Sequence, residues 1–372
     1  MAAHPRNDPF CPGLLNRLAE PPRKVAVLRA SRLGDWLCAT PALRALRAAL
    51  PAAEITLITL PMLRELALRL PHGDRVVDFP GFPGIAEQLF DAQSATRFFT
   101  RMQAERFDLA VQMQGSGVYA NPCALLMGAR ATAGFIRPED GPGRLDAALP
   151  YPREAHEVSR MLALTTFLGA PPCGGTTEFT LWPEDHARAD ALLAGLEPPL
   201  IGLHSAARDA ARRWPLEHFM AVGQALQSQH GGTLVLLGEA DEDASARKVA
   251  RLAGGHAVSL AGRTTLPVLG AAIARLALLV TNDSGPAHIA YALDTPTVTI
   301  FGGADPRAYG PFAPGPFRAA VHEVPCRPRG GVTCATCAFD HACLRGVTVE
   351  QVLAAADSLP HRELTAKHPA RL

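Results

Sequence analysis

The sequence predicts an α/β protein of two domains, each a Rossmann-like unit with a parallel sheet, with the two sheets facing an interdomain cleft. The chain has 372 residues, of which 48% are hydrophobic, enough to give two domains a core each. Short apolar runs alternate with longer segments of helical period along the whole chain. A stretch rich in Pro and Gly, residues 170–183, separates two such series and is typical of an interdomain linker.

The first series of apolar runs predicts the sheet of the N-terminal domain. The segments between the runs are long enough for crossover helices, which implies parallel pairing. Ligands of open parallel sheets bind outside the carboxyl ends of the strands, so the loops that follow each strand are the places to look for chemistry. The predicted strands are 24–29, 54–60, 75–79, 108–112 and 132–135.

The second series predicts an equivalent sheet in the C-terminal domain, with strands 200–204, 233–237, 257–260, 277–281 and 297–301. Thr348 is a suitable N-cap for a last helix over 348–359, and the Pro-rich segment 305–316 and the N-terminal arm are predicted loops. The predicted parts are an arm 1–22, a domain 23–172, a linker 173–183, a domain 184–347, and a helix and tail 348–372.

Charge and hydropathy exclude several classes of protein. Lys and Arg total 36 against 35 for Asp and Glu, and a net charge of +1 gives no field that would attract nucleic acid. No apolar run is long enough to span a bilayer, and the first 22 residues lack the pattern of a signal peptide. We therefore expect a soluble cytoplasmic protein with reduced cysteines.

The loop after the first strand contains the first candidate site. Asp35 follows Gly34, which permits a sharp turn, and a carboxylate at this strand end is able to accept a proton from a hydroxyl. Thr40 and Pro41 predict the N-cap and first turn of the next helix. From the residues alone, a helix-capping role for Asp35 stays open as the alternative. Arg29, Ser31, Arg32 and Gly34 are the predicted substrate-binding neighbours, the two arginines for anionic groups.

A second candidate site follows the strand 200–204. The loop 205–215 contains three arginines, and Arg212 stands two residues before the pair Trp214 and Pro215. Guanidinium groups bind phosphate oxygens in bidentate fashion, so the loop suits the pyrophosphate of a leaving nucleoside diphosphate. A solvated charged loop is the alternative.

The turn after the strand 277–281 predicts a ligand site with a phosphate position at a helix N-terminus. Its residues are Asp283, Ser284, Gly285, Pro286 and His288. Pro286 opens the helix, whose free N–H groups favour an anion, and Gly285 permits close approach. Asp283 would repel phosphate, so we expect it to bond backbone amides or a ribose. His288 either donates to phosphate or is a structural histidine.

Acidic residues follow the strand 233–237. Glu242 is the predicted ribose ligand, because an ionised carboxylate accepts hydrogen bonds from both vicinal hydroxyls. Residues 241–243 also form a D-x-D triplet, a weak indication of a metal site. No G-x-G-x-x-G follows a strand, and no P-loop or G-x-S-x-G motif is present, which disfavours nicotinamide chemistry, P-loop hydrolysis and serine hydrolysis.

Taken together, these segments resemble glycosyltransferase family 9, the ADP-heptose:lipopolysaccharide heptosyltransferases. The matching segments occur in the family's order along most of the chain, which is more specific than any one motif. They are 24–35, 40–46, 108–115, 212–215, 282–288 and 301–306.

The resemblance implies a GT-B fold, in which the N-terminal domain binds the acceptor and the C-terminal domain binds the donor. It implies inverting, metal-independent transfer of a heptose or related sugar from an ADP-sugar, with no cofactor. Asp35 would be catalytic, and Arg212 and the turn 283–288 would bind the donor. The implied acceptor is a lipopolysaccharide core or another lipid-linked envelope glycan, with peripheral contact at the inner membrane; the apolar segment 79–85 suits such a contact, or is an ordinary buried loop.

Several features leave alternatives open. Ala206 and Ala207 stand where some family members carry hydroxyl residues, so the donor sugar is open. Two alternatives to an ADP-heptose transferase stay open. One is a GT-B transferase that uses a UDP- or GDP-sugar, and the other is a catalytically silent nucleotide-sugar binding protein. Four cysteines near the end have spacing that suits either a zinc site or a metal-free structural knot: Cys326, Cys334, Cys337 and Cys343.

Overall fold

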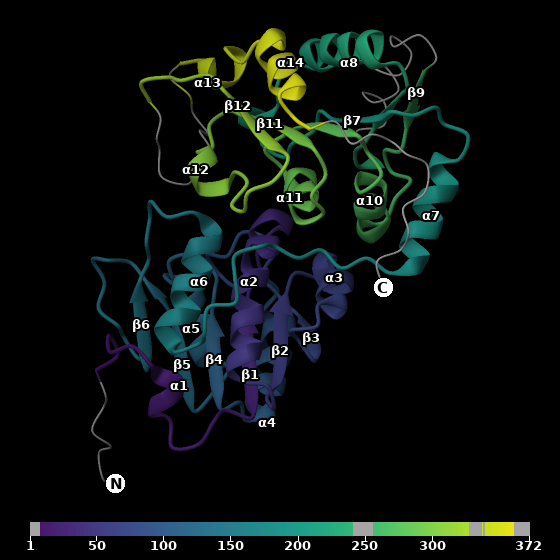
Figure 1. The fold of residues 1–372 in the computed structure, drawn as a ribbon. Coiled ribbons are helices and arrows are strands. Elements are labelled where there is room, and N and C mark those ends of the chain that lie inside the picture. The colour runs from purple at the N-terminus through teal and green to yellow at the C-terminus, as the bar shows by residue number, and fades with distance from the viewer. Residues whose placement is uncertain (1–7, 241–255, 327–336, 338, 361–372) are drawn as a thin grey trace. The chain divides into compact units, whose positions relative to one another are not determined.

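The computed structural model describes residues 8–240, 256–326, 337 and 339–360 (Figure 1). The chain divides into two compact units, Met1–Glu178 and Phe179–Leu372. The division falls within the segment rich in Pro and Gly. Each unit contains a six-stranded sheet in which every strand pair is parallel.

The N-terminal unit has the strand order β3-β2-β1-β4-β5-β6. Its strands are β1 (Lys24–Leu28), β2 (Glu54–Thr59), β3 (Arg75–Asp78), β4 (Leu109–Gln112), β5 (Ala131–Ile136) and β6 (Ala147–Pro150). Its helices are α1 (Leu14–Arg17), α2 (Leu33–Ala49), α3 (Arg64–Arg69), α4 (Ala92–Glu105), α5 (Ala120–Leu126) and α6 (Glu157–Leu168), with a 3-10 turn η1 (Pro61–Leu63). This is the Rossmann order, with its switch point between β1 and β4.

Helices cover both faces of this sheet. One core cluster joins α4 and α5 to β1 and β4 through Phe98, Ala124, Leu28 and Ala110. The helices α2 and α6 pack side by side (Figure 1). The central strands are therefore buried on both faces, which explains why they are continuous apolar runs without alternation.

The C-terminal unit has the strand order β12-β11-β10-β7-β8-β9, the same Rossmann order, with its switch point between β7 and β10. Its strands are β7 (Leu200–His204), β8 (Thr233–Leu236), β9 (Ala257–Ser259), β10 (Leu278–Asn282), β11 (Thr297–Phe301) and β12 (Phe317–Val321). Its helices are α7 (Pro183–Leu193), α8 (Leu216–His230), α10 (Leu266–Ile273), α11 (Gly285–Ala292), α12 (Pro306–Tyr309), α13 (Ala342–Arg345) and α14 (Val349–Asp357), with η2 (Ala210–Arg212) as a 3-10 turn. In Figure 1, α8 and α14 lie on one side of the sheet, and α10 and α11 on the other.

The ten predicted strands are confirmed to within one residue at either end, but each sheet has a further edge strand, β6 or β12, that the sequence did not predict. The predicted loops are also partly wrong. Residues 305–316 include α12, capped by Asp305, and the N-terminal arm includes α1. Thr348 does cap the last helix, in a capping box with Gln351.

The helix after β1 begins earlier than the sequence predicted. α2 begins at Leu33, so Thr40 and Pro41 lie inside it instead of at its N-terminus. Pro41 has no N–H to donate to the carbonyl of Leu37, but the hydroxyl of Thr40 donates to that carbonyl over 2.8 Å. The helix therefore continues through the proline, and Asp35 lies in its first turn.

Candidate functional site

The candidate site of the N-terminal unit lies at the carboxyl end of β1, next to the switch point. Arg32 is the N-cap of α2, with an extended backbone, and Gly34 and Asp35 follow in the first turn. The side chain of Asp35 is 36% exposed, so a substrate hydroxyl is able to reach it, as a general base requires. The positive end of the helix dipole favours its ionised form at this position.

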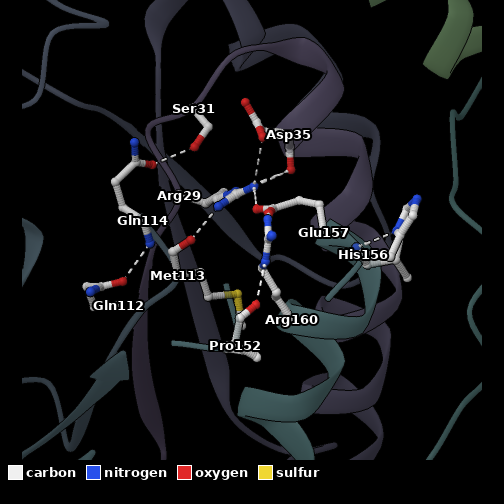
Figure 2. A network of polar contacts seen from close by, with 11 residues as sticks. Arg29, Ser31, Asp35, Gln112, Met113, Gln114, Pro152, His156, Glu157 and Arg160 are labelled. Atoms are coloured by element: carbon white, nitrogen blue, oxygen red, sulfur yellow. Dashed lines mark hydrogen bonds and ion pairs between the residues drawn. The ribbon is translucent and has the colours of Figure 1, made fainter. Parts of the chain in front are cut away.

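A buried arginine holds the backbone of Asp35. The Nη2 and Nε groups of Arg29 donate to the main-chain oxygen of Asp35 over 2.6 and 3.2 Å (Figure 2). Its Nη1 donates to the main-chain oxygen of Met113, which follows β4. The sequence predicted that Arg29 binds an anionic group of a substrate. The structure differs, because Arg29 is 3% exposed and its charge lies inside the protein.

Glu157, the first residue of α6, completes this network. Its Oε1 accepts from Arg29 Nη2, and its Oε2 from Arg160 Nη1, each over 2.7 Å (Figure 2). Burial opposes the charge of Glu157, but the two guanidinium groups outweigh it and hold its pKa below the usual value of 4.5. Burial likewise disfavours the charged form of Arg29, yet Glu157 and Asp35 raise its pKa. The network therefore consists of three ionised, almost fully buried side chains.

A chain of amides connects the loops on both sides of the switch point. Ser31, 4% exposed, donates its hydroxyl to Gln114 Oε1 over 2.6 Å, and the Gln114 N–H donates to Gln112 Oε1 over 2.6 Å (Figure 2). Gln112 in turn donates to Asn121 over 2.9 Å. The hydroxyl of Ser31 is thus used in fixing the loop after β1 against the loop after β4.

The candidate site of the C-terminal unit is the start of α11, directly after β10. Ser284 is the N-cap, Gly285 the first helical residue and Pro286 the second. His288 is 7% exposed, and its ring packs edge-to-face on Tyr291, with the ring centroids 5.7 Å apart. The helix thus begins at Gly285, one residue before the predicted start at Pro286, and the His288 ring is largely inside the unit.

Asp283 pairs with Arg212. The carboxylate is 2% exposed, and its Oδ2 lies 3.1 Å from Arg212 Nη1, although the angle is too poor for a hydrogen bond. Burial raises the pKa of Asp283, and the guanidinium opposes this rise. Arg212 keeps 28% of its side chain exposed, so Asp283 holds a partly open cation beside the start of α11. The nearby Arg213 instead donates to the main-chain oxygen of Ala207.

Two buried polar residues brace the same site. Asn282 accepts from the Trp214 N–H over 3.1 Å and donates to the Ser205 carbonyl over 2.7 Å, which fixes the loop that contains Arg212. His204, the last residue of β7, lies with its Nδ1 3.3 Å from the Ser284 hydroxyl. Burial lowers the pKa of His204 to about 4, so this imidazole is neutral near pH 7.

The other predicted site residues are more scattered. Glu242 and the triplet 241–243 lie outside the described residues, as does Cys334. Within the described part of the chain, no three His, Cys, Asp or Glu side chains gather to ligate a metal ion. In segment 79–85, Phe79 and Ile85 are buried and Phe82 packs on Phe99, which supports the buried-loop alternative.

Four residues of these networks were not predicted from the sequence: Gln114, Glu157, His204 and Asn282. His204 and Asn282 were open to detection, because each ends an apolar strand and a buried polar side chain usually has a hydrogen-bond partner. Gln114 lies two residues beyond the end of β4 and had no such signal. Glu157 lies far from Asp35 in the sequence, at a helix start with no motif, and had no comparable signal. No described helix combines the length and apolar character needed to cross a bilayer.

Comparisons with known proteins agree with this architecture. Solved structures of similar fold include a family 9 glycosyl transferase from Veillonella parvula, at TM-score 0.76 and 21% identity, covering 90% of this chain and 96% of that one. The ADP-heptose lipopolysaccharide heptosyltransferase II of Escherichia coli has TM-score 0.71 and 22% identity, covering 90% of this chain and 98% of that one. At these identities the likeness supports the fold.

Sequence comparison extends to the family. Lipopolysaccharide heptosyltransferase 2 of Salmonella typhimurium is 27% identical over 298 residues, covering 76% of this chain and 84% of the relative. The model of glycosyltransferase family 9 (heptosyltransferase) matches residues 95–335, more than half of the chain. With two Rossmann units and this match, the chain belongs to glycosyltransferase family 9 and is a glycosyltransferase of GT-B architecture.

Proposed function

We propose that this enzyme transfers a heptose from ADP-heptose to a lipopolysaccharide core acceptor, with inversion and without a metal ion or other cofactor. The observation that carries the proposal is Asp35, a partly exposed carboxylate whose main-chain oxygen is held by Arg29 next to the switch point of the first sheet. The family match and the relatives named as lipopolysaccharide heptosyltransferases support the choice of donor and acceptor.

The N-terminal unit supplies the base in this proposal. Asp35 takes the proton of an acceptor hydroxyl while the hydroxyl oxygen forms a bond to the anomeric carbon of the donor. The bond from that carbon to the diphosphate breaks, and ADP leaves with the electron pair. Ser31, Arg32 and Gly34 shape the loop that receives the acceptor, and Arg29 acts on this loop from inside.

The C-terminal unit stabilises the leaving diphosphate. Negative charge grows on the phosphate oxygens as the bond breaks, and Arg212, held by Asp283, is the cation that meets it. The first turn of α11 adds N–H groups and the positive helix end, with Ser284 and Gly285 at its start. His288 and Glu242 remain proposed donor contacts, the latter to the ribose.

The donor site is tested by calorimetry with ADP in the presence of EDTA. If helix-end amides and Arg212 hold the diphosphate, ADP binds without added metal. Metal-dependent binding would restore the 241–243 triplet as a metal site, and no binding of any nucleotide would refute the donor site. UDP and GDP are tested as competitors of ADP. Ala206 and Ala207 lack the hydroxyl groups that would bind phosphate in some family members, so a UDP- or GDP-sugar is the main alternative donor.

The base is tested with Asp35→Asn, which keeps the shape of the side chain but is unable to take up the proton. Turnover should fall by about 10² to 10⁴ with ADP binding retained. Asp91→Asn is the matched control, because Asp91 caps α4 through the Ser94 N–H and is an ordinary helix-start aspartate. Equal turnover of the two variants, with chemistry rate-limiting, would refute the assignment of Asp35 as the base and make it an ordinary first-turn aspartate of α2. No turnover by the wild-type protein would instead support the nucleotide-sugar binding alternative.

The acceptor is tested with labelled donor and fractionated envelope glycolipid. Labelling of a lipopolysaccharide core fraction would support the proposal, and labelling confined to another envelope glycan would replace the acceptor. Peripheral contact with the inner face of the inner membrane remains a prediction that follows from a lipid-linked acceptor. Vesicle co-sedimentation with and without that glycolipid measures it.

A further inference from the structure

Arg29 has a place in the N-terminal unit that substrate binding does not explain. It follows β1 directly, and its guanidinium turns back to bond the main chain six residues later, at Asp35. The third contact, to the Met113 carbonyl, lies on the other side of the switch point. One buried side chain therefore fixes the first turn of α2 against the ends of both central strands.

Glu157 determines how Arg29 is oriented. Nη2 of Arg29 is shared between Glu157 Oε1 at 2.7 Å and the Asp35 carbonyl at 2.6 Å, so the carboxylate sets the plane of the guanidinium. Arginine forms such forked contacts because its donors are fixed in a plane. Glu157 belongs to α6, which packs along α2, so the orientation is backed by a second helix.

Arg29 also places a positive charge close to the Asp35 carboxylate. Its Nη2 lies 3.8 Å from Asp35 Oδ1, close enough for an ion pair and too far for a hydrogen bond between these two atoms. A cation at this distance favours the ionised carboxylate, the form that is able to accept a proton. The same guanidinium thus affects both the position and the charge state of Asp35.

We propose that Arg29 is a positioning residue of the transfer reaction: oriented by Glu157, it holds the Asp35 peptide in place and keeps the carboxylate ready as the base. This inference rests on the proposed function, since it assumes that Asp35 is the base. Arg29 acts through Asp35 and touches neither donor nor acceptor. Its loss therefore affects kcat and its pH dependence, and leaves ADP affinity unchanged.

The network offers a matched control in Arg160. Arg160 is as buried as Arg29 and bonds the other oxygen of Glu157 over the same 2.7 Å. Its remaining donors go to the carbonyls of Pro152 and Arg153, away from Asp35. Replacing either arginine by Met breaks one buried ion pair with the Glu157 carboxylate. Of the two arginines, it is Arg29 that also contacts Asp35.

The experiment measures kcat, its pH profile, ADP affinity and melting temperature for Arg29→Met, Arg29→Lys and Arg160→Met. With Arg29→Met, we expect kcat to fall by about 10², the scale of a catalytic group misplaced by about 1 Å. The acidic limb of the pH profile should move to higher pH, because the cation beside Asp35 is lost. Arg29→Lys keeps the positive charge but lacks the planar pair of donors of the guanidinium. We therefore expect kcat to fall while the acidic limb of the pH profile keeps its position. Arg160→Met lowers the melting temperature, but it lowers kcat and moves the acidic limb much less than Arg29→Met does, because it acts on Asp35 only through Glu157 and Arg29.

The outcomes separate the inference from the function on which it rests. If Arg29→Met and Arg160→Met change the melting temperature and the kinetics alike, Arg29 is only structural and the inference is refuted. If Arg29→Met does not fold, Arg29→Lys decides: wild-type kcat overturns the inference, and a reduced kcat with unchanged ADP affinity supports it. If Asp35→Asn itself keeps full turnover, the proposed function fails first, whatever the arginine variants do.

Discussion

Replacing Glu157 by Gln should destabilise the N-terminal unit strongly. The substitution keeps the shape of the side chain and removes a charge that is ion-paired with Arg29 and Arg160, each over 2.7 Å. All three side chains are at most 4% exposed, so water is unable to replace the lost carboxylate. Breaking a buried pair by removing one partner typically costs about 3–5 kcal/mol, and here two guanidinium groups lose their counter-charge.

The effect is measured by urea unfolding with pulsed hydrogen exchange and mass spectrometry, which reports each unit by its own peptides. With a slope of about 2–3 kcal/mol per M of urea, a loss of 3–5 kcal/mol lowers the midpoint of the N-terminal unit by about 1–2.5 M. The peptides of the C-terminal unit should keep their midpoint. The pH dependence has a definite sign: the pKa of Glu157 is below 4.5 in the folded state, so its stabilisation is present above pH 4.5 and is lost as the pH falls through the folded-state pKa.

Glu105 provides the control, because it also pairs with two cations in the same unit, Arg75 and Lys24, but nearer to solvent. Its side chain is 17% exposed, and those of Arg75 and Lys24 are 33% and 42% exposed. Such pairs near solvent contribute about 0–1 kcal/mol each, so Glu105→Gln, which loses two of them, should change the midpoint by less than about 1 M, below the shift expected for Glu157→Gln. Equal shifts for the two variants would refute the reasoning, since burial would then not decide the cost of a broken pair.

Three further predictions concern the C-terminal unit. Arg212→Ala should lower turnover more than it weakens ADP binding, because the charge that it meets grows in the transition state; a pure rise in KM would contradict this. Asn282→Ala leaves the Trp214 N–H and the Ser205 carbonyl unpaired, at about 1–3 kcal/mol each, and should lower the urea midpoint of this unit; an unchanged midpoint would mean that water replaces the amide. The free energy of unfolding should fall as the pH drops from about 6.5 towards 4, because His204 binds a proton in the unfolded state but stays neutral in the folded state. His204→Gln should remove this part of the pH dependence of the unfolding free energy. An unaltered pH dependence would mean that other groups cause it.

The central strands were predictable because they are buried on both faces. β7 and β11 begin and end at the predicted residues, because a fully buried parallel strand is mostly apolar, with only His204 in β7 and two threonines in β11 as polar members. The edge strands β6 and β12 were not predictable in this way. β6 contains two alanines and ends at Pro150, a composition with little strand preference, and it is ordered by pairing with β5.

The start of α2 shows how a local pattern misleads. Thr40 followed by Pro41 is a common helix-start signal, but the two residues lie in the middle of a helix. The Thr40 hydroxyl compensates the carbonyl that the proline leaves unpaired and also accepts from the Glu178 N–H. Only the packing of this helix and of the segment near residue 178 shows why the proline is tolerated.

The sequence by itself determined the fold class, the family and the positions of Asp35, Arg212 and the turn at Ser284, because each is coded by a short run of neighbouring residues. The tertiary structure alone decided which strands lie side by side and what these residues contact. It brought Glu157 to Arg29 across 128 positions of the chain. Contacts between distant segments depend on how sheets and helices pack, and a local pattern contains no record of that packing.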